Sequence, residues 1–223
     1  MWSRATPDLP PPLADGILPE TPVATAAGWR AAGQLAPGDL VMCFDAGPQP
    51  LLELAYQTLD RPSDLPQHWP LCLPAGAFGN DRAIRLMPEA QVLLESDLAE
   101  DMLGDAFVLF PAAALDGWRG ICRQRPDPGQ SVLRLGFARP VVIHAAGGVL
   151  ISCPAPVLML DPGPGGFNPE GWAVADGPVV QALLADWAAG AGPPHPCWIR
   201  RPCGPCCRRS CPRLRPSRAG FAV

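Results

Sequence analysis

Cysteine is the residue type whose spacing in this sequence most plainly suggests chemistry. Cys203 and Cys206 form a CxxC pair near the C-terminus, and Cys207 and Cys211 follow closely. Four thiolates can bind zinc in a tetrahedron, and the spacing of the first pair suits a zinc knuckle. The second pair abuts the first, however, and leaves almost no chain to fold around an ion. Cys203, Cys206, Cys207 and Cys211 are therefore weak metal candidates, and we expect no cofactor.

The three histidines show no arrangement that predicts proton transfer. His68 lies in the polar loop PQHWP, His144 follows three β-branched residues, and His195 stands between prolines. None has a carboxylate at a spacing that would orient its ring for general base catalysis. We interpret His68 as a solvated loop residue and His144 as a histidine packed within a strand.

The remaining candidate side chains also favour structural roles. Cys43, Cys72, Cys122 and Cys153 show no paired spacing, and in a cytoplasmic chain we expect them to be reduced. Cys43 lies in an apolar run and is interpreted as a small buried hydrophobic residue without an activating base. Five acidic residues that lack the spacing of a calcium loop are expected to form a solvated face. They are Glu95, Asp97, Glu100, Asp101 and Asp105.

Charge is distributed unevenly along the chain. All 17 basic residues are arginine, and the 21 acidic residues all lie at or before Asp186. The body, residues 1–186, therefore carries a net charge of −11, and residues 187–223 carry +7. An acidic body binds nucleic acid poorly, so any affinity for nucleic acid or an anionic membrane would reside in the Arg-rich tail. The partner itself is unknown from the sequence.

The start of the chain lacks the features of a secretion signal. The segment MWSRATPDLPPPLADG has neither a charged beginning nor an apolar run, and no stretch resembles a membrane span. We expect a cytoplasmic protein, with secretion by a route that needs no signal peptide left open.

Short apolar runs between turn residues predict an all-β domain over residues 16–160. The ten predicted strands are residues 22–25, 39–44, 51–57, 71–73, 83–87, 91–95, 107–110, 131–137, 140–145 and 149–153. Gly147 and Gly148 predict a β-hairpin between the last two strands. Residues 112–115 are expected to form at most one helical turn.

Proline content and apolar spacing divide the flanking segments. Residues 1–15 are expected to form an extended leader, because 7–12 are rich in proline. Residues 161–192 are expected to hold a linker, beginning DPGPGG at Asp161, and one amphipathic helix over 178–189. No lysine or threonine follows those glycines, which argues against a phosphate loop. The Arg-, Cys- and Pro-rich tail, residues 193–223, is expected to be disordered.

The order of several motifs matches a known type of domain. They are residues 19–25, 35–41 and 45–50, then 76–80, 85–89 and 92–94, then 108–112 and the Gly147-Gly148 turn. Together they resemble the Hint domain, the hedgehog and intein self-processing module, in its bacterial form. The resemblance covers about residues 16–154 and implies a compact Hint-like fold.

The resemblance also implies chemistry on the domain's own backbone. In such domains a Cys, Ser or Thr at the first position attacks the preceding carbonyl, which converts an amide into a thioester or ester. A histidine supplies the proton that the departing backbone nitrogen requires. By register with residues 19–25 the family nucleophile falls on Gly16, and by register with Pro88 the family histidine falls on Ala90. Neither residue can perform its part.

The two losses predict a degenerate active site with no catalytic residue. We expect a Hint-like domain that lacks self-cleavage and splicing and serves as a binding or structural module. One alternative is an active domain with a substitute nucleophile, for which Thr21 and Thr25 are weak candidates because both are predicted strand residues. Another alternative is an adaptor that binds a polyanionic partner through its basic tail. Whether the chain is an enzyme stays open at this point.

Overall fold

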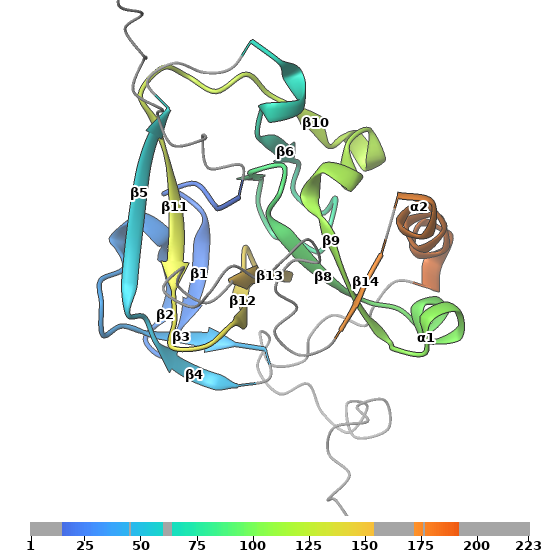
Figure 1. Ribbon diagram of the computed structural model, residues 1–223, viewed down its shortest axis with the longest axis horizontal. Coiled ribbons are helices and arrows are strands. Elements are labelled where there is room, and N and C mark those ends of the chain that lie inside the picture. The colour runs from blue at the N-terminus through green and yellow to red at the C-terminus, as the bar shows by residue number, and fades with distance from the viewer. Residues whose placement is uncertain (1–14, 45, 60–63, 154–171, 176, 192–223) are drawn as a thin grey trace, which may run out of the picture. The chain divides into compact units, whose positions relative to one another are not determined.

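The fold is built from short strands in three sheets (Figure 1). The computed structural model describes residues 15–44, 46–59, 64–153, 172–175 and 177–191. The predicted leader, the Asp161 linker and the tail with its cysteines lie outside this part of the chain, apart from Asp15. The all-β class expected from the sequence is confirmed for the described residues.

The largest sheet has nine strands in the order β14-β9-β8-β13-β12-β1-β3-β4, with β2 paired to β1. Its pairs are antiparallel except for β14 with β9. The strands are β1 Pro22–Thr25, β2 Gly28–Ala31, β3 Leu40–Cys43, β4 Gly47–Pro50, β8 Gln91–Glu95, β9 Phe107–Pro111, β12 Val141–Ala145, β13 Val149–Cys153 and β14 Ala173–Val174.

Two smaller sheets complete the β structure. One has the order β10-β6-β7, with β10 Cys122–Arg123, β6 Leu71–Leu73 and β7 Ile84–Leu86. The other pairs β5 Glu53–Leu59 with β11 Gln130–Gly136 along their full lengths. The isolated bridges of Ile17 with Leu86 and with Leu133 connect β7 and β11 through one residue. The start of the domain therefore lies between the two smaller sheets.

The predicted hairpin at Gly147 and Gly148 is confirmed. Strands β12 and β13 pair in register from Val141 with Cys153 to Ala145 with Val149. Gly148 lies so close to Gly79 that an added Cβ would collide with the Gly79 carbonyl oxygen. Buried Asn80 holds the facing loop, since its amide nitrogen donates to the carbonyl of Pro74 at 2.7 Å. Position 148 therefore requires glycine, because the hairpin turn and the loop that holds Gly79 approach each other too closely for a side chain.

Two helical segments pack beside the sheets (Figure 1). The predicted amphipathic helix is confirmed as α2, Gly177–Asp186, which continues as a π-helix over Trp187–Ala191. Its apolar face buries Val180, Leu183 and Leu184. Trp187 then stacks on Trp118 with ring centroids 5.0 Å apart. These contacts fasten the C-terminal helix to the body.

Helix α1, Asp97–Leu103, is an element that the strand pattern did not predict. Ser96 caps it, because the Ser96 side chain accepts from the backbone N–H of Ala99, and Gly104 ends it with φ of 77°. These two residues are the usual sequence signals for the ends of a helix. The four acidic residues Glu95, Asp97, Glu100 and Asp101 are exposed, and Asp105 is half-buried.

Strands β2 and β4 also depart from the expected elements. Gly28 lies outside the predicted strands but begins β2, with φ of 108°. Pro48 and Pro50 argue against a strand, yet both belong to β4. Strand β4 lies at the edge of its sheet, where a missing N–H leaves no neighbour unpaired. Among the described helices, none has the length and apolar content needed to cross a membrane.

Candidate functional site

Gly16 lies buried where the two smaller sheets meet. The next residue, Ile17, donates its N–H to the Leu133 carbonyl at 3.0 Å and accepts from the Leu133 N–H at 2.8 Å. On the other side, the Met87 N–H donates to the Gly16 carbonyl at 3.2 Å. Position 16 is therefore held by backbone contacts on both sides.

Ala90 is fully buried in the turn that leads into β8. Its N–H donates to the carbonyl of Met87 at 3.1 Å, and its carbonyl accepts from Ala112 at 2.8 Å. Met87 thus bonds to both Gly16 and Ala90. The structure brings together the two positions that the family resemblance assigns to the nucleophile and the histidine, and both lack a reactive side chain.

The backbone at Gly16 has a conformation that other residues rarely adopt. Its φ is +130°, and a Cβ added there would lie 2.6 Å from the Leu133 carbonyl oxygen. The same atom would lie 2.8 Å from a methyl group of Val132. Backbone oxygen cannot move away as the end of a flexible side chain can. The site therefore excludes any side chain at position 16 unless the backbone shifts.

A small cleft beside Gly16 gathers residues from three parts of the chain. It is lined by Asp15, Gly16, Ile17, Leu133, Arg134, Leu135, Ile151, Ser152 and Cys153. The Arg134 guanidinium forms an ion pair with the Asp15 carboxylate at 3.5 Å. Burial raises the pKa of Asp15, and nearby Glu89 adds to this rise, whereas Arg134 and the Gly16 N–H oppose it. The charged groups at the cleft are thus Asp15 and Arg134.

Cys153 is the one thiol that lines this cleft. It ends β13 and is buried, with 6% of its surface exposed. Burial raises the pKa of the Cys153 thiol well above its usual range, and the Asp15 carboxylate raises it further. A protonated thiol is a weak nucleophile. The sequence holds no signal for this placement, since Cys153 reaches Gly16 only through the pairing of distant strands.

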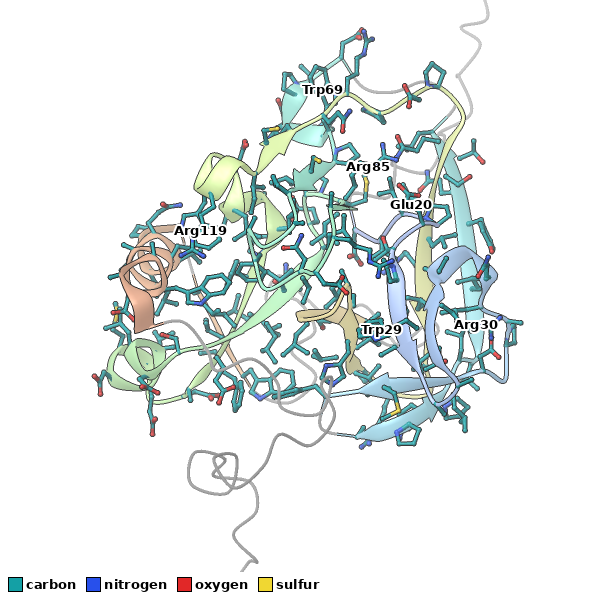
Figure 2. All side chains as sticks on the ribbon, turned by 180° about the vertical axis from the view of Figure 1, so that it is seen from behind. Glu20, Trp29, Arg30, Trp69, Arg85 and Arg119 are labelled. Atoms are coloured by element: carbon teal, nitrogen blue, oxygen red, sulfur yellow. The ribbon has the colours of Figure 1, made fainter. Side chains whose placement is uncertain are left out.

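The two threonines near the domain start occupy different environments. The Thr25 hydroxyl donates to the Gly28 carbonyl at 2.6 Å and accepts from the Ala27 N–H at 3.2 Å. It therefore shapes the turn between β1 and β2. The Thr21 hydroxyl is buried and has no hydrogen-bond partner within the described residues. Glu20, which precedes Thr21 in the sequence, pairs with Arg85 at 2.6 Å, and Figure 2 shows the two side chains side by side.

The other predicted site residues lie away from the cleft or outside the described part. His68 is exposed in a 3-10 helix, Pro66–His68. His144 is buried in β12, and burial lowers its pKa to about 4. Cys43 is fully buried in β3. His195 and the four tail cysteines fall outside. Within the described residues, no three His, Cys, Asp or Glu side chains are placed to hold a metal ion.

Comparison with known proteins identifies one family. The family model described as Hint domain matches residues 16–152 of this chain. The match begins at Gly16 and ends next to Cys153, and it contains every strand from β1 to β12. It also spans more than half of the chain.

Several solved structures similar to this chain are inteins or intein-like domains. A bacterial intein-like domain from Clostridium thermocellum is 15% identical, covering 61% of this chain and 97% of that chain, with a TM-score of 0.45. A splice-inactive variant of the AceL NrdHF class 3 split intein is 14% identical, covering 64% and 99%, with a TM-score of 0.43. The gp41-1 intein is 11% identical, covering 62% and 97%, with a TM-score of 0.38. No curated protein matches the chain in sequence.

Proposed function

This chain belongs to the Hint domain family, and we propose that it keeps the family fold without self-cleavage or splicing and acts as a binding or structural module. The observation that carries the proposal is the environment of Gly16. Glycine offers no group that could attack the Asp15 carbonyl, and the Leu133 oxygen occupies the space that a side chain would need. The residue at position 16 lacks a nucleophile, and the packing around it leaves no space for one.

The reaction also requires an acid that protonates the departing nitrogen, and the family position for this acid holds alanine. An amide nitrogen must gain a proton before it departs, and Ala90 has no side chain that could supply one. The buried His144 is uncharged at pH 7, since its pKa is about 4, so the cationic form that would serve as a general acid is scarcely populated. An acyl shift at residue 16 would therefore lack both nucleophile and acid.

Intact mass spectrometry tests this proposal directly. The full-length chain is purified and incubated at neutral pH with and without a small thiol, which would resolve a thioester. We expect one species near 23.6 kDa in both samples. Thiol-dependent fragments that begin at or near residue 16 would contradict the proposal.

Cys153 is the substitute nucleophile that the cleft would favour if cleavage occurred. It lines the cleft with Gly16, although burial keeps its thiol protonated at neutral pH. The Cys153→Ala variant tests whether Cys153 is that nucleophile, because alanine, unlike serine, offers no group that could attack a carbonyl. Cleavage that disappears in this variant would assign the attack to Cys153, and cleavage that persists would direct attention to Thr21.

A second candidate function rests on the charge of the tail. Residues 193–223 carry seven arginines and no acidic residue, whereas the body is acidic. Such a segment could join the domain to a polyanionic partner, because clustered arginines bind phosphates and release counterions. Retention on an anionic matrix, compared with and without residues 193–223, tests this function. Equal retention of the two forms would exclude it.

A further inference from the structure

Two cysteines that lie 50 positions apart in the sequence face each other across a pair of strands. Cys72 in β6 and Cys122 in β10 are direct partners in the antiparallel register of the three-stranded sheet. Direct partners in such a pair point to the same face of the sheet. Neither cysteine belongs to the Gly16 cleft. The proposed function leaves this pair without a role.

The hydrogen bonding of β6 and β10 indicates how close the two thiols are. In this register Gln124 stands opposite Pro70, two positions from the Cys122–Cys72 pair. The Gln124 N–H donates to the Pro70 carbonyl at 2.9 Å. Hydrogen-bonded pairs alternate along antiparallel strands, so Cys72 and Cys122 belong to the same class, with Cα atoms about 5.5 Å apart. A disulfide needs Cα atoms about 4.4–6.8 Å apart. The backbone spacing therefore suits a crosslink.

The same register makes a crosslink between these strands easy to reduce. Side chains of direct partners have Cβ atoms about 4.5–5.5 Å apart, whereas a relaxed disulfide places them about 3.8 Å apart. The strands must therefore approach each other by about 1 Å. Strand β10 has two residues and lies at the sheet edge, where such a shift disturbs one neighbour. Strained disulfides are the labile ones in thiol exchange.

Both thiols can be reached by a small reagent, but to different extents. Cys122 is exposed and Cys72 is half-buried, in contrast with the buried Cys43 and Cys153. The residue opposite Cys72 on its other side is Arg85, from β7. The apolar face of β6 buries Leu71 and Leu73 in the core. The two cysteines and Arg85 thus form one row on the outer face of the sheet.

From this register and exposure, we propose that Cys72 and Cys122 form a reversible disulfide by exchange with small-molecule disulfides such as glutathione disulfide. The Cys122 thiolate attacks one sulfur of glutathione disulfide, which forms a mixed disulfide and releases one glutathione. The Cys72 thiolate then attacks the Cys122 sulfur, which closes the protein disulfide and releases a second glutathione. The two thiol protons pass to the two released glutathiones, so the protein is oxidised and glutathione disulfide is reduced.

The crosslink would act on the sheet that supports the Gly16 region. Leu86 of β7 bridges to Ile17, and Arg85 pairs with Glu20 at 2.6 Å. Strand β6 lies between β7 and β10, so β10 belongs to the same sheet as the strand that bridges to the start of the domain. The proposed disulfide would therefore lie outside the Gly16 cleft, in the sheet that contacts the start of the domain.

Peptide mapping of the full-length chain tests the proposal. The reduced protein is equilibrated with glutathione buffers of increasing oxidised share, its remaining thiols are blocked, and it is digested with trypsin without reductant. We expect the peptide 120–123, which carries Cys122, to be linked to the peptide that carries Cys72 as the main species. Dithiothreitol should release it. Glutathione retained on Cys122 at every ratio, or a link from Cys122 to a tail cysteine, would overturn the proposal.

Two variants sharpen the assignment. Cys72→Ser should abolish the crosslink and leave one glutathione on Cys122, because nothing remains to resolve the mixed disulfide. Cys43→Ala is the matched control, since Cys43 lies on the same tryptic peptide as Cys72, and it should leave the crosslink intact. A crosslink that persists in Cys72→Ser would refute the pairing. Circular dichroism of the reduced variants verifies that both are folded.

Discussion

At the scale of single residues, Gly16 has both a chemical and a steric consequence. Without a side chain it cannot attack the preceding carbonyl, and its positive φ lets the backbone approach Leu133 closely. Replacing glycine by a nucleophile would therefore have to overcome an unfavourable dihedral angle and a clash with a backbone oxygen. The packing that surrounds position 16 has no space for a side chain.

Gly16→Cys, alone or with Ala90→His, is expected to leave the chain uncleaved and to lower the free energy of unfolding. Gly16→Ala isolates the stability effect and should cost about 3 kcal/mol or more, because strain and overlap add. Urea unfolding measures this cost, and intact mass measures cleavage.

Gly28→Ala is the matched control for this prediction. Gly28 also has a positive φ, of 108°, but an added Cβ there would meet no atom within 4 Å. This variant should cost only about 1–2 kcal/mol, from the dihedral angle alone. Equal costs at the two positions would show that the contact with Leu133 does not restrict position 16.

His144 makes the stability of the domain depend on pH. Burial lowers its folded pKa to about 4 from an ordinary value of 6.5, so the unfolded chain binds a proton first as the pH falls. Stability should therefore be lost between about pH 6.5 and pH 4, by roughly 2 kcal/mol at pH 5. Urea unfolding at several pH values measures the trend.

The His144→Gln variant should have a flatter pH profile than the native chain. The raised pKa of Asp15 makes its own contribution to stability increase as the pH falls, opposite to that of His144. Subtracting the His144→Gln profile from the native profile removes the Asp15 contribution, because both proteins share it. A native slope in His144→Gln would assign the pH dependence to other groups.

At the scale of elements, the C-terminal helix is anchored by aromatic contacts. Trp187 meets Phe78 edge-on, with centroids 4.8 Å apart, and stacks on Trp118. The Arg119 guanidinium lies 4.6 Å from the Trp118 ring centroid, and it is labelled beside α2 in Figure 2. Arg119 adopts φ of 44°, which is uncommon for a residue other than glycine. This cluster holds the π-helical end of α2 against the body.

Trp187→Ala should lower the free energy of unfolding by about 3 kcal/mol, because it removes a large side chain that contacts two other aromatic rings. Trp29→Ala, at an exposed position in β2, should cost less than about 1 kcal/mol. Urea unfolding of both variants measures the difference. Equal effects would mean that Trp187 does not anchor the helix.

At the scale of the whole molecule, charge and contacts divide the chain near the same place. Internal contacts separate residues 1–193 from residues 194–223. The acidic residues all lie in the first of these units, and the second has a cluster of arginines and no acid. Folding stability and affinity for anions should therefore be separable properties of the two units.

Removal of residues 194–223 should leave the melting temperature within about 2 °C of the native value, since the buried core of the described residues is built from positions up to Leu184. The net charge of the protein becomes more negative, so weaker retention on an anionic matrix is expected. Thermal unfolding followed by circular dichroism measures the first effect. A large fall in melting temperature would show that the tail contributes to the folded body.

The sequence by itself determined the class of fold and the residue types at the two positions where the family resemblance places the nucleophile and the histidine. Strands 22–25, 71–73, 91–95 and 149–153 were predictable to the residue, because apolar runs between turn residues depend on local preferences. The absence of a nucleophile at Gly16 and of a histidine at Ala90 also follows from residue identity and register alone.

Only the tertiary structure decided which distant residues meet. Cys153 lines the Gly16 cleft, and Cys72 faces Cys122, although no spacing in the sequence links either pair. The positive φ of Gly16 and its contact with Leu133 are likewise properties of the folded backbone. The physical reason is that strand pairing depends on the packing of the whole core, so it joins segments that local sequence patterns cannot connect.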